Sequence, residues 1–112
     1  MSATPIVYLE LPAKDIAAAK KFYSDAFGWR WQDWGPDYAD TTAGIGAGLN
    51  ATGEHQPKAP LAVMKVEDLE AARDGVRKAG GRITLDIFSF PGGRRFHFTD
   101  PAGNELAVLS EK

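Results

Sequence analysis

The sequence from Asp15 to Trp29, DIAAAKKFYSDAFGW, recurs in similar form from Asp68 to Gly81, DLEAARDGVRKAGG. Each copy begins with an Asp that can cap a helix, continues through good helix formers and ends at Gly. At an offset of 53 residues (68 − 15) five positions are identical: Asp15/Asp68, Ala18/Ala71, Ala19/Ala72, Ala26/Ala79 and Gly28/Gly81. An internal repeat constrains the whole fold, so we predict one motif present twice.

The segments that flank the two helices also match. Residues 6–11 and 61–66 are rich in β-formers and precede the helices. Short strands are predicted at 29–34, 38–43 and 45–49 after the first helix, and at 82–90, 94–99 and 105–109 after the second. The prediction is therefore one α+β domain over 1–112, with helices near 15–27 and 68–79, a βαβββ module at about 5–50, a linker at 51–60 and a second module at about 61–110.

Hydrophobic periodicity predicts which faces are buried. The first helix is expected to pack through one stripe, which contains Ile16, Ala19, Phe22, Tyr23, Ala26 and Phe27. In the first strand, alternation places the aliphatic residues Val7, Leu9 and Leu11 on the face beneath the helices. Tyr8 and Glu10 then lie on the opposite, more polar face, where a ligand could bind.

Composition restricts the classes of function. The 112 residues are 44% hydrophobic and 25% charged, and the chain contains no apolar run long enough to span a bilayer, so no membrane partner is expected. A net charge of −2 gives no broad basic surface for nucleic acid. The lack of cysteine excludes disulfides and thiolate metal sites and fits a reducing compartment. Met1–Pro5 lacks the basic and apolar regions of a secretory signal, so we expect a cytoplasmic location.

Three segments carry a resemblance to a known family: ELPAKDIAAAKKFYSDAFGW at 10–29, VEDLEAARDGVRKAGG at 66–81 and FTDPAGNELAV at 98–108. In this order, on a duplicated βαβββ pattern, they resemble the vicinal oxygen chelate superfamily of glyoxalase I, bleomycin-resistance proteins and extradiol dioxygenases. The resemblance spans nearly the whole chain. It implies two βαβββ modules that form a curved mixed sheet around a cavity, usually in a homodimer, but it does not fix the reaction.

The resemblance also implies where metal ligands would stand. In metal-dependent members, His, Glu or Gln side chains project from the first and last strands of each module. Here three of these positions hold Tyr8, Leu61 and Ala107, and the fourth falls in the Gly- and Ala-rich run at 45–49. A divalent ion needs several oxygen or nitrogen donors at about 2–2.5 Å, and Leu and Ala offer none. We therefore expect no metal at the usual site, and no cofactor.

A displaced site is the alternative. Glu10 and Glu105 each lie two residues from a family ligand position and share its face by alternation. His97 would join the helix-packed face if the turn at 100–103 has four residues, but polarity favours the cavity face, because Phe98 suits a core better. Glu10, His97 and Glu105 could then bind a metal or act as acid and base. The simpler interpretation, separate polar residues at the cavity edge, is favoured.

Several large aromatic residues lie on strands and turns in a chain with a small core: Trp29, Trp31, Trp34, Phe88 and Phe90. Some are expected to line the pocket and hold a flat or apolar ligand, with Trp31 as the first candidate. Arg94 and Arg95 could meet an anion, although arginines at an exposed hairpin are commonly only solvated. His55, in the polar linker, is expected to be solvated.

Three functions of different class are compatible with these features. The first is a metal-free small-molecule binding protein of the bleomycin-resistance kind, which the missing metal ligands favour, with a homodimer as its assembly. The second is a metal-dependent lyase, isomerase or dioxygenase with displaced donors, and the third is an accessory domain that acts through its dimer surface. The predicted ligand-binding residues are Tyr8, Glu10, Trp31, Leu61, His97, Glu105 and Ala107.

Overall fold

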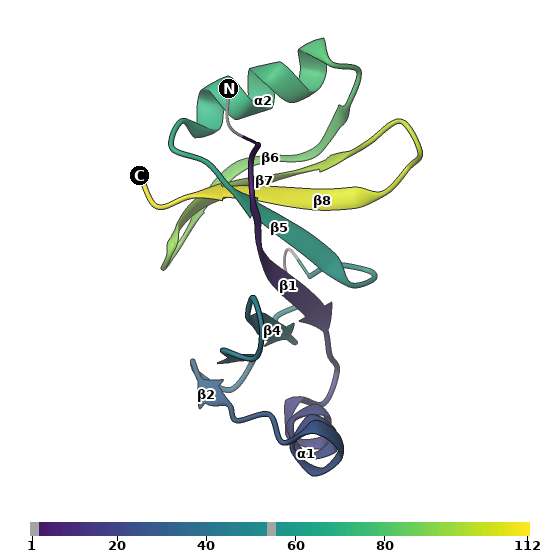
Figure 1. Cartoon of the computed structure of the whole chain (residues 1–112), viewed down its shortest axis with the longest axis vertical. Helices are drawn as coiled ribbons and strands as arrows, with labels where there is room; N and C mark the ends of the chain where they lie inside the picture. Colours follow the sequence, from purple (N-terminus) through teal and green to yellow (C-terminus); the bar gives the residue numbers. More distant parts are fainter. Residues whose placement is uncertain (1–2, 54–55) are drawn as a thin grey trace. The chain divides into compact units, whose positions relative to one another are not determined.

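The computed structural model describes residues 3–53 and 56–112, which form two helices and eight strands (Figure 1). The first half holds β1 (Ile6–Pro12), α1 (Ile16–Phe27), β2 (Gln32–Asp33), β3 (Tyr38–Thr41) and β4 (Ala47–Asn50). The second half holds β5 (Leu61–Lys65), α2 (Leu69–Lys78), β6 (Arg82–Phe90), β7 (Gly93–Thr99) and β8 (Glu105–Ser110). The class is α+β, as predicted. The largest difference is β2, which spans two residues where the aromatic alternation of 29–34 predicted a longer strand.

The chain divides into two compact units, Tyr8–Leu61 and Met1–Val7 with Ala62–Lys112. The division falls inside β1 and at the start of β5, not in the linker at 51–60 that the sequence suggests. The residues before Tyr8 belong with the C-terminal unit, where the Lys65 N–H donates to the Pro5 carbonyl oxygen over 3.3 Å. His55, expected to be solvated, lies outside the described residues.

The two halves have the same strand order, as the sequence repeat predicts. The first half is ordered β2-β3-β4-β1 and the second β6-β7-β8-β5. In each half the first strand pairs in parallel with the last, and the remaining neighbours are antiparallel. The duplicated motif is therefore visible in hydrogen-bonded topology as well as in sequence.

Equivalent caps begin the two helices. The Asp15 carboxylate accepts from the Ala18 N–H and the Asp68 carboxylate from the Ala71 N–H, each over 3.0 Å. Such side-chain acceptors satisfy N–H groups that have no partner within the helix. The C-terminal ends differ: α1 stops at Gly28, whose φ of 72° is left-handed, whereas α2 ends one residue before a right-handed Ala79.

The prediction that α1 buries its apolar stripe is wrong. No residue of α1 is buried, and Phe22 and Phe27 are 58% and 66% exposed. The helix contacts β4, but β2 is only two residues long, so little sheet lies beneath the stripe. The aromatic side chains contact one another instead: the Tyr23 ring stacks on Trp29 with centroids 4.8 Å apart. Periodicity identified the apolar face but not what covers it.

α2 packs as expected. Its Leu69 side chain is fully buried with Phe96 of β7 and Val108 of β8, and partly buried hydrophobic residues surround them. The helix contacts β6, β7 and β8 along one face of these strands (Figure 1). This core fixes the register of the C-terminal unit, because a shift of one residue would turn Phe96 away from α2.

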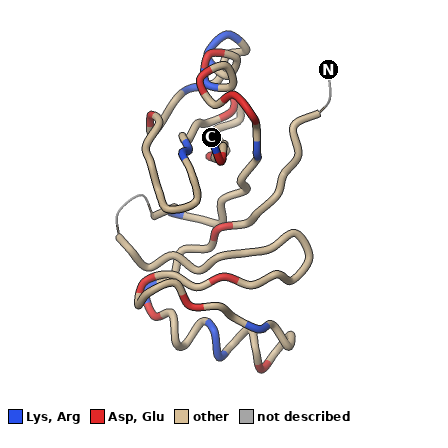
Figure 2. Tube along the Cα trace, turned by 90° about the vertical axis from the view of Figure 1, so that its left-hand side faces the viewer, with Lys and Arg blue, Asp and Glu red and all other residues tan. Residues whose placement is uncertain are grey.

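No helix in the described part of the chain has the length and apolar character needed to cross a membrane. Basic and acidic residues are interspersed along both helices (Figure 2). On α2 they follow one another as Glu70, Arg73, Asp74, Arg77 and Lys78. Neither helix therefore presents a charged face of one sign.

Candidate functional site

One row of residues crosses three strands in the unit Tyr8–Leu61. Gly48 of β4 is the partner of Glu10 in β1 and of Asp40 in β3. Residues that are direct partners share a face of the sheet, so the two carboxylates flank a glycine on one face. Alternation places Tyr8 and Tyr38 on the same face, as predicted for Tyr8 and Glu10.

The hydroxyl groups of Tyr8 and Tyr38 meet above this glycine. Their oxygens are 2.6 Å apart, and the Tyr38 hydroxyl donates to Glu10 Oε1 over 3.5 Å. A Cβ atom on Gly48 would lie 2.0 Å from the Tyr8 hydroxyl oxygen and 2.2 Å from that of Tyr38. Only a residue without a side chain leaves room for the pair.

The three groups run from an open surface into the protein. Tyr8 is half-buried and lines a hollow of about 270 Å³ together with Asp40, Thr41, Thr42, Gly44, Ile45 and Gly46. Glu10 is only 2% exposed and is the one buried residue of β1. A buried carboxylate is thus linked to a surface hollow through two phenol groups. Thr41 is buried and Ile45 is 60% exposed, so the hollow has both polar and apolar walls.

A second polar group lies on the C-terminal unit. His97 is the partner of Ala107, and Thr99 is the partner of Glu105, so these side chains share a face. Phe96 and Phe98 alternate with them and contribute to the α2 core. The structure therefore places His97 on the face away from α2, as polarity predicts. The four-residue turn considered as the alternative is not formed, because five residues, 100–104, separate Thr99 from Glu105.

His97 and Glu105 are close but not in direct hydrogen-bonding contact. His97 Nδ1 lies 3.8 Å from Glu105 Oε2, and this oxygen accepts from the Thr84 hydroxyl over 2.9 Å. His97 is 3% exposed, and its ring lies 6.0 Å from that of Phe88. Glu105 is therefore held by Thr84 at the edge of a buried imidazole.

Arg95 is buried, although sequence reasoning treated it as a solvated hairpin residue. It is 8% exposed, and its guanidinium carbon lies 5.4 Å from the Phe88 ring centroid and 5.7 Å from that of Phe90. Attraction between the cation and the ring faces offsets part of the cost of burial. Phe88 and Phe90 therefore lie beside the Arg95 guanidinium group.

Arg94 points instead to α2. Its two terminal nitrogens donate to the two carboxylate oxygens of Glu70 over 2.6 and 3.1 Å. This paired geometry with Arg94 lowers the pKa of Glu70 to about 2. Arg94 is therefore part of a surface ion pair between α2 and β7.

Trp31 lies in the aromatic cluster next to α1. Its ring centroid is 6.2 Å from that of Tyr23 and 5.9 Å from that of Trp29. The residues that line the hollow beside Tyr8 do not include Trp31. Trp34, in contrast, donates from Nε1 to the Asp40 carboxylate over 3.0 Å. Of the tryptophans, it is Trp34 that contacts a residue of the hollow.

The positions at which the resemblance places metal ligands do not offer a suitable set of donors. Leu61 and Ala107 are buried, 1% and 0% exposed, and have no donor atoms. The Tyr8 hydroxyl is hydrogen-bonded to Tyr38, and the run at 45–49 supplies the backbone of Gly48 beneath it. Within 3–53 and 56–112, no group of three His, Asp or Glu side chains could hold a metal ion. The three residues of the predicted displaced metal site belong to different units: Glu10 lies in one unit, and His97 and Glu105 lie in the other.

Sequence reasoning missed four residues that complete these groups: Tyr38, Asp40, Gly48 and Thr84. Alternation along 38–43 would have placed Tyr38 and Asp40 on one face, but pairing them with Tyr8 and Glu10 requires the register of three strands. Gly48 belongs to the Gly- and Ala-rich run at 45–49, and the sequence does not show which side chains approach it. Thr84 carries no signal in the sequence that points to Glu105.

Two modules of identical strand order, each with one helix, define a duplicated βαβββ fold. A family model described as the Glyoxalase/Bleomycin resistance protein/Dioxygenase superfamily matches residues 5–108. A "Glyoxylase-like domain-containing protein" of Didymella fabae is 32% identical over 119 residues, which cover 91% of this chain and 90% of that protein. The chain belongs to this superfamily, as the sequence resemblance indicated.

Solved structures have the same fold. A superfamily member from Vibrio splendidus 12B01 aligns with a TM-score of 0.70 at 20% identity, over 92% of this chain and 96% of its own. The Mn(II)-bound glyoxalase from Novosphingobium aromaticivorans aligns with a TM-score of 0.68 at 23% identity, over 96% of this chain but 39% of its own. This chain therefore spans less than half of the length of that glyoxalase. At these identities the likeness shows the fold alone.

Proposed function

We propose that this protein binds a small apolar or aromatic molecule without a metal ion. The observation that carries the proposal is the chemistry at the positions where family members hold metal: Leu61 and Ala107 are buried and apolar, and Tyr8 is hydrogen-bonded to Tyr38. A metal site that lacks even one of its ligands is usually opened or lost. Sequestering or sensing a ligand needs a surface of suitable shape but no Lewis acid.

The hollow beside Tyr8 is the proposed binding site. The Tyr8 ring and Ile45 supply apolar surface, and Gly44 and Gly46 allow a flat ring to approach the backbone. A cytoplasmic setting is part of the proposal, because a chain without cysteine needs no oxidising compartment.

Backbone amide NMR with a flat aromatic probe, 4-nitroanisole, tests the binding function. We expect saturable shifts of the N–H signals of Gly44, Ile45 and Gly46. Ile45→Glu should abolish them, because it puts a charge where the ring would lie. Ile6→Glu is the matched control: Ile6 is 52% exposed, Ile45 is 60% exposed, and Ile6 does not line the hollow. Shifts that never saturate, or that survive Ile45→Glu, would contradict the proposal.

Elemental analysis tests the metal-free part. Protein purified from medium supplied with zinc, nickel, iron and manganese should contain no stoichiometric transition metal, and should show no glyoxalase activity when zinc or nickel is added. One metal per chain, lost in Glu10→Gln or Glu105→Gln, would promote the second candidate, an enzyme with displaced ligands. That candidate is favoured by one observation, the approach of His97 Nδ1 to Glu105 Oε2 at 3.8 Å.

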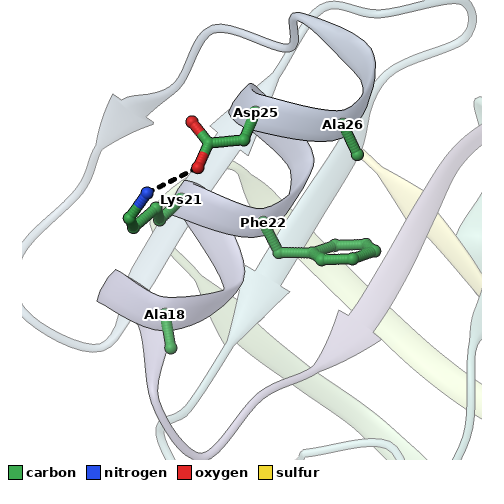
Figure 3. A pocket seen from close by; sticks show the side chains of 5 residues that line it. All are labelled: Ala18, Lys21, Phe22, Asp25 and Ala26. Carbon is green, nitrogen blue, oxygen red and sulfur yellow. Dashed lines mark hydrogen bonds and ion pairs between the residues drawn. The ribbon is translucent and has the colours of Figure 1, made fainter.

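A homodimer completes the proposal, with the face of α1 around Phe22 as its contact. A shallow hollow of about 460 Å³ is lined by Ala18, Lys21, Phe22, Asp25 and Ala26, all on α1 (Figure 3). Phe22, flanked by small Ala side chains, is 58% exposed. Lys21 and Asp25, 2.5 Å apart, give this face one charge of each sign, so two copies in antiparallel orientation are complementary.

Sedimentation velocity over a range of protein concentrations tests this assembly. Wild-type protein should be dimeric at high micromolar concentration, and Phe22→Glu should be monomeric, because the new charge would be buried against its symmetry mate. Trp34→Glu is the control, since Trp34 is 62% exposed and lies outside this face. A wild-type monomer, or a dimer that persists in Phe22→Glu, would contradict the proposed contact.

A further inference from the structure

The wall of the hollow beside Tyr8 carries a charged group, the carboxylate of Asp40. Asp40 lies on β3 and is half-buried, and it lines the hollow together with Tyr8 and Ile45. The volume of about 270 Å³ lies just below the range of about 300–1,000 Å³ that is usual for drug-sized ligands, so the hollow suits a smaller molecule. A molecule that fills it contacts a carboxylate and an apolar surface at the same time.

Trp34 fixes the direction of this carboxylate. Its backbone N–H donates to the Tyr38 carbonyl oxygen over 2.9 Å, which closes the turn between β2 and β3. Its indole Nε1 donates to Asp40 Oδ2 over 3.0 Å. The two oxygens of a carboxylate offer about four lone-pair positions, so the carboxylate has capacity for further donors beside the indole. Asp40 can therefore accept a hydrogen bond from a ligand while it keeps the bond to Trp34.

The turn between β3 and β4 holds the apolar part of the wall in place. The Gly46 N–H donates to the Ala43 carbonyl oxygen over 2.9 Å, and the Ala43 N–H donates to the Thr41 hydroxyl oxygen over 3.4 Å. A Cβ atom added to Gly46 would lie 3.5 Å from Tyr8 Cδ1, so the Tyr8 ring packs close to this turn. Ile45, which lies in the same turn, is 60% exposed. The apolar wall therefore exists before a ligand binds, which lowers the entropic cost of binding.

We propose that the hollow binds a small aromatic or apolar molecule that carries an ammonium group, and that Asp40 is the residue that selects this group. An ammonium nitrogen donates a charge-assisted hydrogen bond to a carboxylate, which is stronger than a hydrogen bond between neutral groups. The Tyr8 ring and Ile45 meanwhile contact the apolar part of the ligand. The inference rests on the proposed binding function and adds the chemical class of the ligand.

Two probes of similar shape but different charge test this selection. Benzylamine is a cation at neutral pH and benzyl alcohol is neutral, and both can donate a hydrogen bond. Titrations of the backbone N–H signals of Gly44, Ile45 and Gly46 give the two dissociation constants. We expect wild-type protein at low ionic strength to bind benzylamine about three- to tenfold more tightly than benzyl alcohol. High salt should reduce this preference, because the hollow is open to solvent.

Asp40→Asn removes the charge but keeps the shape of the side chain and an oxygen acceptor for the Trp34 indole. This variant should bind benzyl alcohol as wild type does, which also shows that the hollow is intact, and should lose the preference for benzylamine. Asp37→Asn is the matched control. It removes the same charge from an exposed residue of the preceding turn that does not line the hollow, and it should keep the preference.

The indole N–H signal of Trp34 gives a second measurement, on wild-type protein, because this group donates to the Asp40 carboxylate. Benzylamine should shift this signal with the same dissociation constant as the amides of the turn, since the ammonium group and the indole share one carboxylate. The signal is assigned by its loss in Trp34→Phe. An indole signal that stays in place while the amides of the turn shift would contradict the role of Asp40.

The outcomes separate the ligand class from the binding function. If both probes bind saturably with equal affinity, or if the preference for benzylamine survives Asp40→Asn, the ligand class is overturned while the binding function stands. A preference that is lost equally in Asp37→Asn would reflect the net charge of the protein and would also overturn the role of Asp40. If neither probe shifts the amides of the turn saturably, the binding function fails and the inference fails with it.

Discussion

Gly48 lies directly beneath the hydroxyl group of Tyr8: a Cβ atom added to Gly48 would be 2.0 Å from the phenol oxygen. The same atom would be 2.2 Å from the Tyr38 hydroxyl oxygen, so one glycine holds open the space in which the two phenols meet. The lack of a side chain at position 48 is therefore what allows the two hydroxyl groups beside the hollow to form a hydrogen bond. The residue type at position 48 therefore determines whether the hydrogen-bonded pair can form.

Gly48→Ala is expected to destabilise the protein by about 1–3 kcal/mol, because overpacking forces both tyrosine rings out of their positions. Urea unfolding measures this loss. Gly75→Ala is the matched control in the exposed face of α2, where an added Cβ meets no atom within 4 Å. It should stabilise the fold by about 0.5–1 kcal/mol, because alanine favours the helix. Equal effects of the two substitutions would show that Gly48 is not sterically required.

Much of the fold can be predicted from the sequence, because the information is local or repeated. The capping residues Asp15 and Asp68 mark both helices, and the alternation of Phe96, His97 and Phe98 predicts which face of β7 meets α2. These signals depend on short-range hydrogen bonds and on burial, which composition reflects directly. Family membership follows from the order of such segments along the chain.

The candidate site is predicted only in part, because it depends on contacts across strands. Tyr8 and Glu10 are assigned to the correct face by alternation in one strand. Their partner Tyr38 is distant in sequence and meets Tyr8 only when β1, β4 and β3 are in register. Trp31 illustrates the reverse case: a large aromatic residue suggests a ligand pocket, but its ring contacts those of Tyr23 and Trp29. Residue type alone does not distinguish these environments.

The capping residues predict a graded loss of helix stability. Asp68→Ala should lower the free energy of unfolding by about 1 kcal/mol, because the Ala71 N–H loses its acceptor. Asp68→Asn should retain most of the stability, because an amide oxygen can cap as well. Thermal unfolding followed by circular dichroism measures both variants. If the Asn variant loses as much as the Ala variant, the charge and not the hydrogen bond is what matters.

The proposed dimer predicts the response to charge reversal on α1. Lys21→Asp and Asp25→Lys should each weaken the dimer severalfold, because each places like charges opposite one another across the symmetric contact. The double variant restores one charge of each sign on every copy and should recover most of the affinity. Sedimentation equilibrium measures the dissociation constants. Additive losses in the double variant would rule out this antiparallel arrangement.

Glu70 and Arg94 predict how acid affects stability. Two charge-assisted hydrogen bonds from Arg94 lower the pKa of Glu70 from 4.5 to about 2, so the folded protein releases this proton more readily than the unfolded chain. The stability that this ion pair gives the folded protein is complete above pH 4.5. It is lost as the pH falls through about 2, because protonation of Glu70 then favours the unfolded chain. Because the pair is on the surface, the stabilisation that it provides depends on the salt concentration.

Glu70→Gln should therefore flatten the dependence of stability on pH within this window. Urea unfolding at low ionic strength, at several values between pH 5 and the lowest pH at which the protein stays folded, compares the variant with wild type. The difference between them should be largest at pH 5 and should shrink steadily as the solution becomes more acidic. High salt should reduce it at every pH. Glu111→Gln is the matched control, because the Glu111 carboxylate pairs with Lys65, whereas the Glu70 carboxylate pairs with Arg94. A pH-independent difference for Glu70→Gln would mean that Arg94 binds the Gln amide as well as it binds the carboxylate.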